Sequence, residues 1–134
     1  MELTHDILRA LYDKKYAKRV RKIIEARVIS NPKEAYYYAA DILGGRFPEG
    51  EAAIATEALP SLWYAQFVLS GPFPAGEDAI SEKGHRAFIY ATHILHSRFP
   101  AGEPAIAADD YYAPLYKNFF NIQTPFGDHH ESNR

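Results

Sequence analysis

Apolar residues recur along the middle of the chain at the spacing of one helix face. In the first such segment they stand at positions i, i+3, i+4, i+7 and i+8: Ala35, Tyr38, Ala39, Ile42 and Leu43. The same pattern returns in residues 64–69 and 87–95. A stripe of this kind buries one side of an amphipathic α-helix against its neighbours. The pattern therefore predicts three similar helices.

These helices belong to a sequence repeat of 26 residues. Its Phe-Pro step occurs at Phe47, Phe73 and Phe99, and nine positions are identical in all three copies: Tyr, Ala, Leu, Phe, Pro, Gly, Glu, Ala and Ile. A short second segment starts at each Phe-Pro step, where proline favours the first turn of a helix. Two helices in each copy predict stacked hairpins, because one hairpin alone cannot bury its apolar face.

The predicted fold is all-α: a short, right-handed α-solenoid of stacked helical hairpins, with three 26-residue units and divergent caps. One helical-repeat domain covers residues 1–126, with a basic N-terminal cap at 1–30, the repeats at 31–108 and a C-terminal cap at 109–126. The polar residues 127–134 are predicted to be a disordered tail. The predicted helices are 4–12, 14–28, 32–44, 48–56, 60–70, 74–81, 85–96, 100–108 and 111–121.

The ends of the repeat region are less regular. Tyr16-Ala17 resembles Tyr38-Ala39 at a spacing of 22, which indicates a degenerate first repeat. Tyr116 keeps the period from Tyr90, but no Phe-Pro-Gly-Glu turn follows it. Terminal repeats depart from the pattern because one of their faces has no neighbour.

The recurring phenylalanine and glycine residues predict how the helices of a unit pack and where they end. Each Phe of the Phe-Pro steps is predicted to plug the seam between the two helices of its own unit. The recurring glycine, first seen at Gly50, predicts close backbone contact with the adjacent unit. Gly44-Gly45 and Gly71 are helix stop signals, since glycine accepts the left-handed conformation. His96-Ser97 stands there in the third copy, so its turn is predicted to close differently.

Composition narrows the classes of function. The 134 residues contain no Cys, which excludes disulfides, thiolate zinc sites and a cysteine nucleophile. No apolar run approaches about 18 residues and no secretory signal opens the chain, so we expect no membrane association and a cytoplasmic location. A Gly-rich phosphate loop, a Gly-x-Ser-x-Gly elbow and a His-Glu-x-x-His motif are also absent from the sequence. The chain is therefore predicted to be no enzyme and to use no cofactor.

Charge is divided unevenly along the chain. Residues 1–33 hold nine Lys/Arg and four Asp/Glu, whereas the remainder holds six and thirteen. On a helix, one face of the N-terminal segment would carry four cations: Lys14, Lys18, Arg21 and Lys22. This face is either an anion-binding surface or a solvated face of a capping helix. The solvated face is favoured because the net charge is −2 and no RNA-binding signature accompanies the cations.

A glutamate also recurs in each copy, at Glu51, Glu77 and Glu103. We interpret these residues as helix-end stabilisers that pair with Arg46 and Arg98, in preference to a cation site.

Three histidines lie close together in the third copy: His85, His93 and His96. Because the equivalent positions in the other copies hold no common ligand type, no metal site is predicted.

Bulky residues precede the Tyr-Ala pair in successive units. They are Tyr36, Tyr37, Leu62, Trp63, Phe88, Ile89, Tyr111 and Tyr112. They cannot all face the same seam, so some are expected to form an aromatic strip on the surface, where such residues favour protein binding. Burial of the first helix on two sides is the alternative.

The run Tyr38–Ala55 resembles a short tandem repeat of uncharacterised bacteriophage and bacterial proteins. Its unit there is Tyr-Ala-x-x-Val/Ile-Ile/Leu-x-Gly-Arg-Phe/Trp-Pro-Glu-x-Glu-x-x-Ile, and the resemblance covers residues 31–116. This chain departs from the repeat at Pro72, where Arg is usual, and at Ala75 and Ala101, where Glu is usual. The resemblance implies a phage or bacterial origin, with a phage-encoded chain acting in the host cytoplasm, and carries no assigned chemistry.

These patterns predict a non-enzymatic protein-interaction module. We expect a phage or bacterial accessory protein that binds and modulates a host factor, because stacked repeats present extended surfaces. The alternative is a module that binds a nucleic acid or another phosphate ligand through the basic N-terminal helix.

Overall fold

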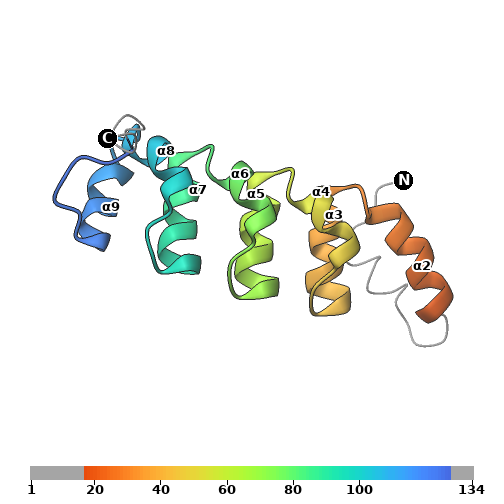
Figure 1. The fold of residues 1–134 in the computed structure, drawn as a ribbon. Helices are drawn as coiled ribbons and strands as arrows, with labels where there is room; N and C mark the ends of the chain where they lie inside the picture. The colour runs from red at the N-terminus through yellow and green to blue at the C-terminus, as the bar shows by residue number, and fades with distance from the viewer. Residues whose placement is uncertain (1–16, 128–134) are drawn as a thin grey trace.

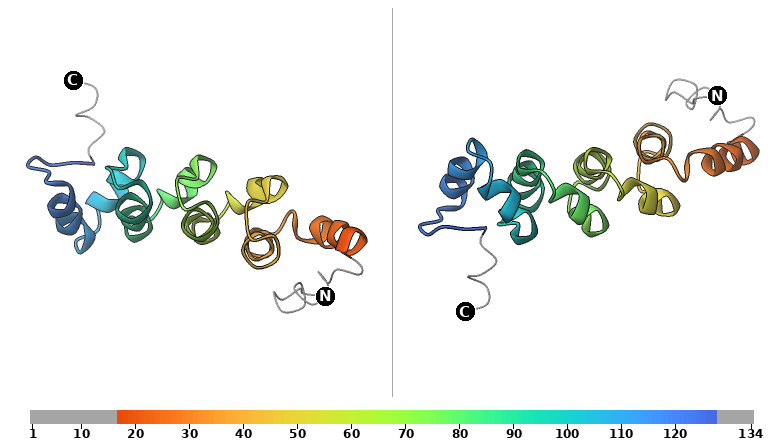
Figure 2. Two further views of the ribbon diagram at one scale, coloured as in Figure 1. Left: turned by 90° about the horizontal axis from the view of Figure 1, so that it is seen from below. Right: turned by 90° about the horizontal axis from the view of Figure 1, so that it is seen from above.

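The computed structural model describes residues 17–127, and within this range every regular element is a helix. The longest helices stand side by side in a row, with α2 (Ala17–Val28) at one end and α9 (Tyr112–Phe120) at the other (Figure 1). Seen along their axes, the helices form two rows (Figure 2). This confirms the predicted all-α stack of helical hairpins. The predicted helix 4–12 and the start of 14–28 lie outside the described residues.

The first helix of each unit begins as an α-helix and continues as a π-helix. The three pairs are α3 (Pro32–Tyr37) with η2 (Tyr38–Leu43), α5 (Ala58–Trp63) with η4 (Tyr64–Leu69), and α7 (Gly84–Ile89) with η6 (Tyr90–Leu95). Asn31 caps α3 as predicted, since its side-chain oxygen accepts a hydrogen bond from the Glu34 N–H at 2.9 Å. The change to π-helix was not predicted.

Each π-helix ends at a residue in the left-handed conformation. The φ angle is 66° at Gly44, 51° at Ser70 and 55° at His96. The N–H groups of this residue and the next both bond to the carbonyl of the alanine in the Tyr-Ala pair. The expectation of a different turn in the third copy is therefore wrong, because His96 adopts the same conformation as Gly44. In the second copy the left-handed residue is Ser70, and Gly71 follows it.

The second helix of each unit is a 3-10 turn followed by a short α-helix. The pairs are η3 (Pro48–Gly50) with α4 (Glu51–Ile54), η5 (Pro74–Gly76) with α6 (Glu77–Ile80), and η7 (Pro100–Gly102) with α8 (Glu103–Ala107). The Phe before each proline is buried, and its ring centroid lies 4.9 or 5.0 Å from that of the Tyr in its own unit. These Phe side chains plug the seam within the unit, as predicted.

Glycine lets each 3-10 turn approach the first helix closely. A β-carbon at Gly76 would stand 2.5 Å from the Ser61 hydroxyl oxygen, and one at Gly102 would stand 2.6 Å from the β-carbon of Ala87. Ser61 and Ala87 belong to the same unit as the glycine that they contact. The expectation of contact with the adjacent unit is therefore wrong.

The N-terminal helix α2 takes the place of a second helix of the repeat. Glu25 stands 26 residues before Glu51, and Val28 is fully buried like the isoleucine one period later. The Tyr38 hydroxyl donates a hydrogen bond to Glu25 at 2.6 Å, as later tyrosines do to later glutamates. The alignment of Tyr16-Ala17 with a first helix is therefore wrong, because Glu25 and Val28 place α2 one period of 26 before a second helix.

The C-terminal cap closes the row. Tyr116 is fully buried, and the Phe126 ring lies 5.0 Å from its ring, so the segment after α9 replaces the missing Phe-Pro plug. Asn121 is exposed where the previous unit has the half-buried Leu95. A polar end is expected of a capping repeat, because no further unit covers it. In the described part of the chain, no helix has both the length and the apolar character needed to cross a membrane.

The left-handed turns generate a stability prediction. Replacing Ser70 or His96 with glycine should raise the free energy of unfolding by about 0.5–1 kcal/mol, because glycine adopts this conformation without strain. Gly44→Ala should lower it by a similar amount. Urea denaturation followed by circular dichroism measures both effects. Gly45→Ala is the matched control, since its φ is not left-handed and no atom lies within 4 Å of the added β-carbon; equal losses at positions 44 and 45 would contradict the argument.

Candidate functional site

A buried tyrosine joins each unit to the one before it. Its hydroxyl donates a hydrogen bond to the carboxylate of the glutamate 13 residues earlier. The four pairs are Tyr38 with Glu25 at 2.6 Å, Tyr64 with Glu51 at 2.5 Å, Tyr90 with Glu77 at 2.6 Å and Tyr116 with Glu103 at 2.7 Å. All four tyrosines are fully buried. We call each pair a tyrosine latch.

Three of the latches also hold the backbone of the Phe-Pro step. The N–H of Phe47, Phe73 and Phe99 donates to the hydroxyl of the tyrosine 17 residues later, at 2.9, 3.0 and 2.8 Å. Each of these hydroxyls therefore accepts one hydrogen bond and donates another. A buried polar group needs such partners, because leaving it unpaired costs free energy.

Arginine completes two of the latches. Arg46 binds Glu51 through Nε at 3.0 Å and Nη2 at 3.1 Å, and Arg98 binds Glu103 through the same atoms at 2.8 and 2.9 Å. These are the predicted pairs. The tyrosine partners of the glutamates were not predicted, although their constant separation of 13 residues is visible in the sequence.

The surroundings of the latch shift the pKa values of its members. Burial, together with the hydrogen bond to Glu51, raises the pKa of Tyr64 to about 12. Burial and the bond to glutamate also raise the pKa of Tyr90 and Tyr116. Burial alone would raise the pKa of the Glu103 carboxyl, but hydrogen bonds from Arg98 and Tyr116 outweigh it and lower that pKa. At neutral pH the Tyr116 phenol is therefore neutral beside a charged Glu103 carboxylate, and Tyr64 and Tyr90 are neutral as well.

The latches hold the stack together and leave no free group for chemistry at the tyrosines. The hydroxyls of Tyr64, Tyr90 and Tyr116 each have two partners and no exposed surface. The buried tyrosine hydroxyls therefore offer no binding surface of their own.

The predicted aromatic strip divides into buried and accessible residues. Tyr36 and Leu62 are buried, so these two do not belong to a surface strip. Rings of neighbouring units meet here, with centroids 5.6 Å apart for Tyr36 and Trp63 and 5.1 Å apart for Phe88 and Tyr112. Most of the strip seals the seams between units, as the alternative interpretation expects.

The remaining strip residues keep some access to solvent. Tyr37, Trp63, Ile89 and Tyr112 are half-buried, as is Phe88. Tyr111 is 68% exposed, and its ring packs on that of Tyr112 at 4.8 Å. A binding role for these residues stays a prediction.

Sequence reasoning missed a second row on the same helices. Phe67, His93 and Phe119 are separated by one period each and are exposed, Phe67 by 62% and Phe119 by 57%. Each stands four residues after Trp63, Ile89 or Leu115, and therefore on the same helix face. We call these six residues and Tyr111 the outer face. The 26-residue period contained the signal, but the exposure of the row did not follow from it.

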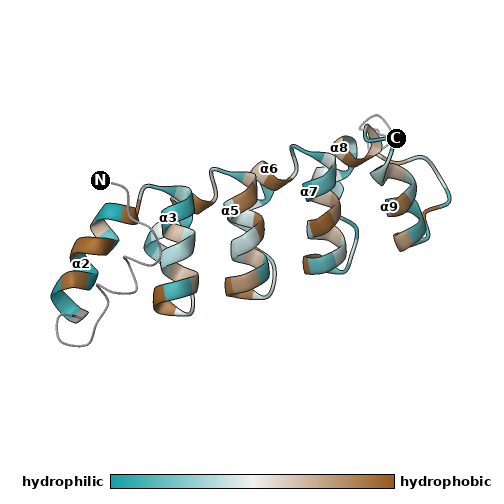
Figure 3. Ribbon diagram, turned by 180° about the vertical axis from the view of Figure 1, so that it is seen from behind, coloured by the Kyte–Doolittle hydropathy of each residue, from teal (hydrophilic) through white to brown (hydrophobic). Residues whose placement is uncertain are grey.

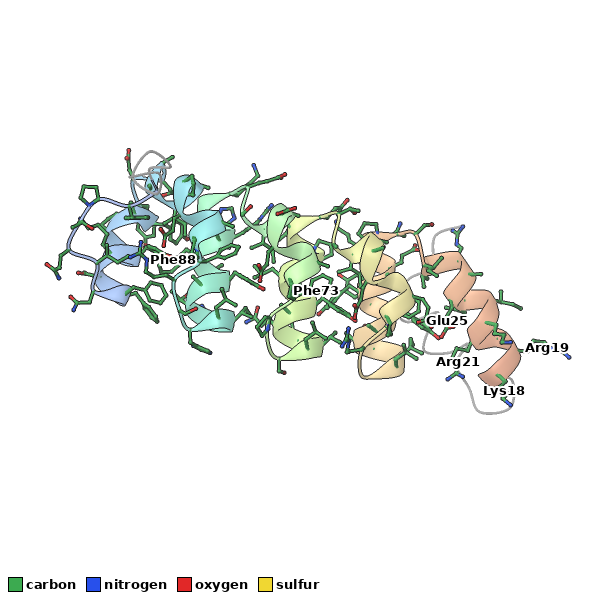
Figure 4. The ribbon with its side chains drawn as sticks, in the orientation of Figure 1. Lys18, Arg19, Arg21, Glu25, Phe73 and Phe88 are labelled. Carbon is green, nitrogen blue, oxygen red and sulfur yellow. The ribbon has the colours of Figure 1, made fainter. Side chains whose placement is uncertain are left out.

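The predicted anion-binding residues lie at the far end of the stack. Lys18 and Lys22 are exposed on α2, and Arg21 lies 3.9 Å from Glu25 (Figure 4). Lys14 lies outside the described residues. Arg19, also exposed, adds a cation that the prediction did not include. Binding of an anion or a nucleic acid here stays a prediction.

Two other places were considered as sites. In residues 17–127 no three His, Asp or Glu side chains come together as metal ligands. His85 lies beside the Tyr112 ring at 6.3 Å, whereas His93 and His96 are exposed. A groove of about 400 Å³ lies between the first two units, lined by the Arg46–Glu51 pair and by residues of 69–75.

Removing one latch hydroxyl should destabilise the fold. In Tyr90→Phe the buried N–H of Phe73 loses its acceptor and Glu77 loses its donor, so the free energy of unfolding should fall by about 1–3 kcal/mol. Chemical denaturation measures the change. Tyr111→Phe removes a hydroxyl from an exposed ring and should change stability by less than about 0.5 kcal/mol. Equal effects of the two variants would refute the role of the latch.

The raised tyrosine pKa values predict alkaline unfolding. The pKa of a buried phenol is higher in the folded state than in the unfolded state, where it is about 10. The neutral phenol therefore makes its whole contribution to the free energy of unfolding below about pH 10. This contribution is lost as the pH rises through the folded pKa, which is about 12 for Tyr64. Helix content and phenolate absorbance, followed together above pH 10, should show the buried tyrosines ionising only as helix is lost. Complete ionisation near pH 10 with helix retained would contradict this.

Comparison with known proteins returns no match. No family model, no curated protein and no solved structure matches the chain. The likeness to a phage and bacterial repeat therefore stays a resemblance of sequence pattern. The geometry of the latches and of the outer face carries the functional argument.

Proposed function

We propose that the chain is a non-enzymatic protein-interaction module that binds its partner through the outer face. The observation that carries the proposal is the exposure of Phe67, Tyr111 and Phe119 on one face of the stacked helices. Exposed aromatic side chains lose much accessible surface when a partner covers them, and they dominate the energetics of many interfaces.

The packing of the stack supports this assignment. Apolar segments of the chain recur near the same end of successive first helices (Figure 3), and the tyrosine of each unit is fully buried. The latches fix these helices relative to one another, so the rings are presented on a preorganised support. Preorganisation lowers the entropic cost of binding.

The outer face differs from unit to unit, whereas the buried tyrosine, phenylalanine and isoleucine of the repeat are the same in each. The row that contains Phe67, His93 and Phe119 has Asp41 in the first unit, which is also exposed. Each unit therefore offers a different side chain at one position on a constant scaffold. Such variation suits recognition of one particular protein surface. The chain would act as a phage or bacterial accessory protein, and its proposed partner is a host factor.

Affinity capture with paired variants tests the proposal. The unmodified chain should retain one partner in stoichiometric amount from a bacterial lysate, and Phe67→Ser/Phe119→Ser should reduce its apparent affinity at least about tenfold, because each ring contributes as an interface anchor. Ile23→Ser removes an apolar side chain that is 64% exposed on α2 and serves as the matched control.

Circular dichroism should show unchanged helix content in all three proteins. Undiminished capture by the double variant would refute the proposed face. Failure of the unmodified chain to retain any partner from several hosts would refute the proposed function.

A further inference from the structure

Three of the four tyrosine latches have an arginine beside the glutamate carboxylate, and one does not. A guanidinium accompanies Glu25, Glu51 and Glu103: Arg21 at 3.9 Å, Arg46 at 3.0 Å and Arg98 at 2.8 Å. The latch of the second unit has Pro72 at the position of Arg46 and Arg98. Its glutamate, Glu77, has no ion pair to any described residue.

The filled latches show what the carboxylate can bind. In both repeats the arginine uses Nε and Nη2 to reach the two oxygens of the glutamate, at 2.8–3.1 Å. The tyrosine hydroxyl shares one of these oxygens, Oε2, with the arginine. A two-point contact of this kind suits the planar guanidinium better than an ammonium group.

Glu77 retains the other half of the same arrangement. Its Oε2 accepts the hydroxyl of Tyr90 at 2.6 Å, as in the filled latches, and its side chain is half-buried. The ring of Pro72 cannot supply a hydrogen-bond donor. The carboxylate is thus held in the same latch as its two equivalents, without the cation that they have.

We propose that the carboxylate of Glu77, held in place by Tyr90, is a receptor site for an arginine side chain of the protein partner. The inference rests on the proposed interaction function and names the chemistry of one partner contact. The partner's guanidinium takes the place that Arg46 and Arg98 hold in their own units. The negative charge of residues 34–127 favours the approach of a cationic side chain, since they contain eleven Asp/Glu against five Lys/Arg.

Titration of the full chain with N-acetyl-arginine amide tests the site. Backbone amide shifts in nuclear magnetic resonance spectra should change saturably around Glu77 and Tyr90. Glu77→Gln, which can still accept the tyrosine hydrogen bond, should raise the half-saturation concentration about fivefold, as expected for loss of an ion pair of about 1 kcal/mol.

Two substitutions at position 72 provide matched variants. Pro72→Arg should place an arginine of the chain itself at the site, as in the neighbouring units. It should therefore weaken binding of the probe to the same degree as Glu77→Gln. Pro72→Ala removes the proline but leaves the site open, so its binding should equal that of the unmodified chain. N-acetyl-citrulline amide, the neutral counterpart of the probe, should cause no saturable shift.

Three outcomes would overturn the proposal. The first is that the unmodified chain shows no saturable amide shift. The second is that Pro72→Arg binds the probe as tightly as the unmodified chain does. The third is that the shifts spread evenly over other exposed acids such as Glu57 and Glu82. Each outcome concerns the chain and a small probe alone. It therefore leaves the capture test of the outer face unaffected, and failure of that test would not alter the titration.

Discussion

The stack depends on a buried phenol hydroxyl that has two partners in the preceding unit. Burying this group is favourable only if its hydrogen-bonding capacity is satisfied. The glutamate accepts from it, and the N–H of the Phe-Pro step donates to it. Phenylalanine at the tyrosine position would bury the same ring but leave the N–H of the Phe-Pro step without its acceptor and the glutamate without its tyrosine donor. The latch therefore links two units. It also supplies a hydrogen-bond acceptor for the backbone N–H at the turn between the two helices of the preceding unit.

The same constraint accounts for the two terminal helices of the described stack. At the N-terminal end α2 supplies Glu25, so the first tyrosine finds its acceptor although no Phe-Pro step precedes it. At the C-terminal end Phe126 covers Tyr116, and Asn121 presents a polar group where a further unit would pack. Each terminal helix thus keeps the tyrosine–glutamate hydrogen bond to the adjacent unit, while its other positions depart from the repeat.

A constant set of buried tyrosines, phenylalanines and isoleucines inside the stack leaves the outside free to vary. The buried tyrosines and isoleucines repeat without change, whereas the exposed position after them holds Asp41, Phe67, His93 or Phe119. The glutamates lie between these extremes, because their tyrosine partner is constant and their arginine partner is not. A rigid interior with a varied exterior allows a short chain to present one specific surface.

The sequence by itself determined the repeat, the two helices of each unit and the Phe plug. Identity at a fixed spacing and helical periodicity are local properties, and they can be read without coordinates. Even so, a spacing of 22 at Tyr16 misled the alignment of α2, where Glu25 and Val28 already carried the period of 26.

Only the tertiary structure decided which side chains meet across units. His96 takes a left-handed conformation that its residue type does not favour, because the packed π-helix before it requires the same turn as in the first unit. Tyr36 is buried and Phe67 is exposed, although both are aromatic residues on first helices, since neighbouring helices cover one face and not the other. Exposure of a side chain depends on where the adjacent unit lies, and no local pattern contains that information.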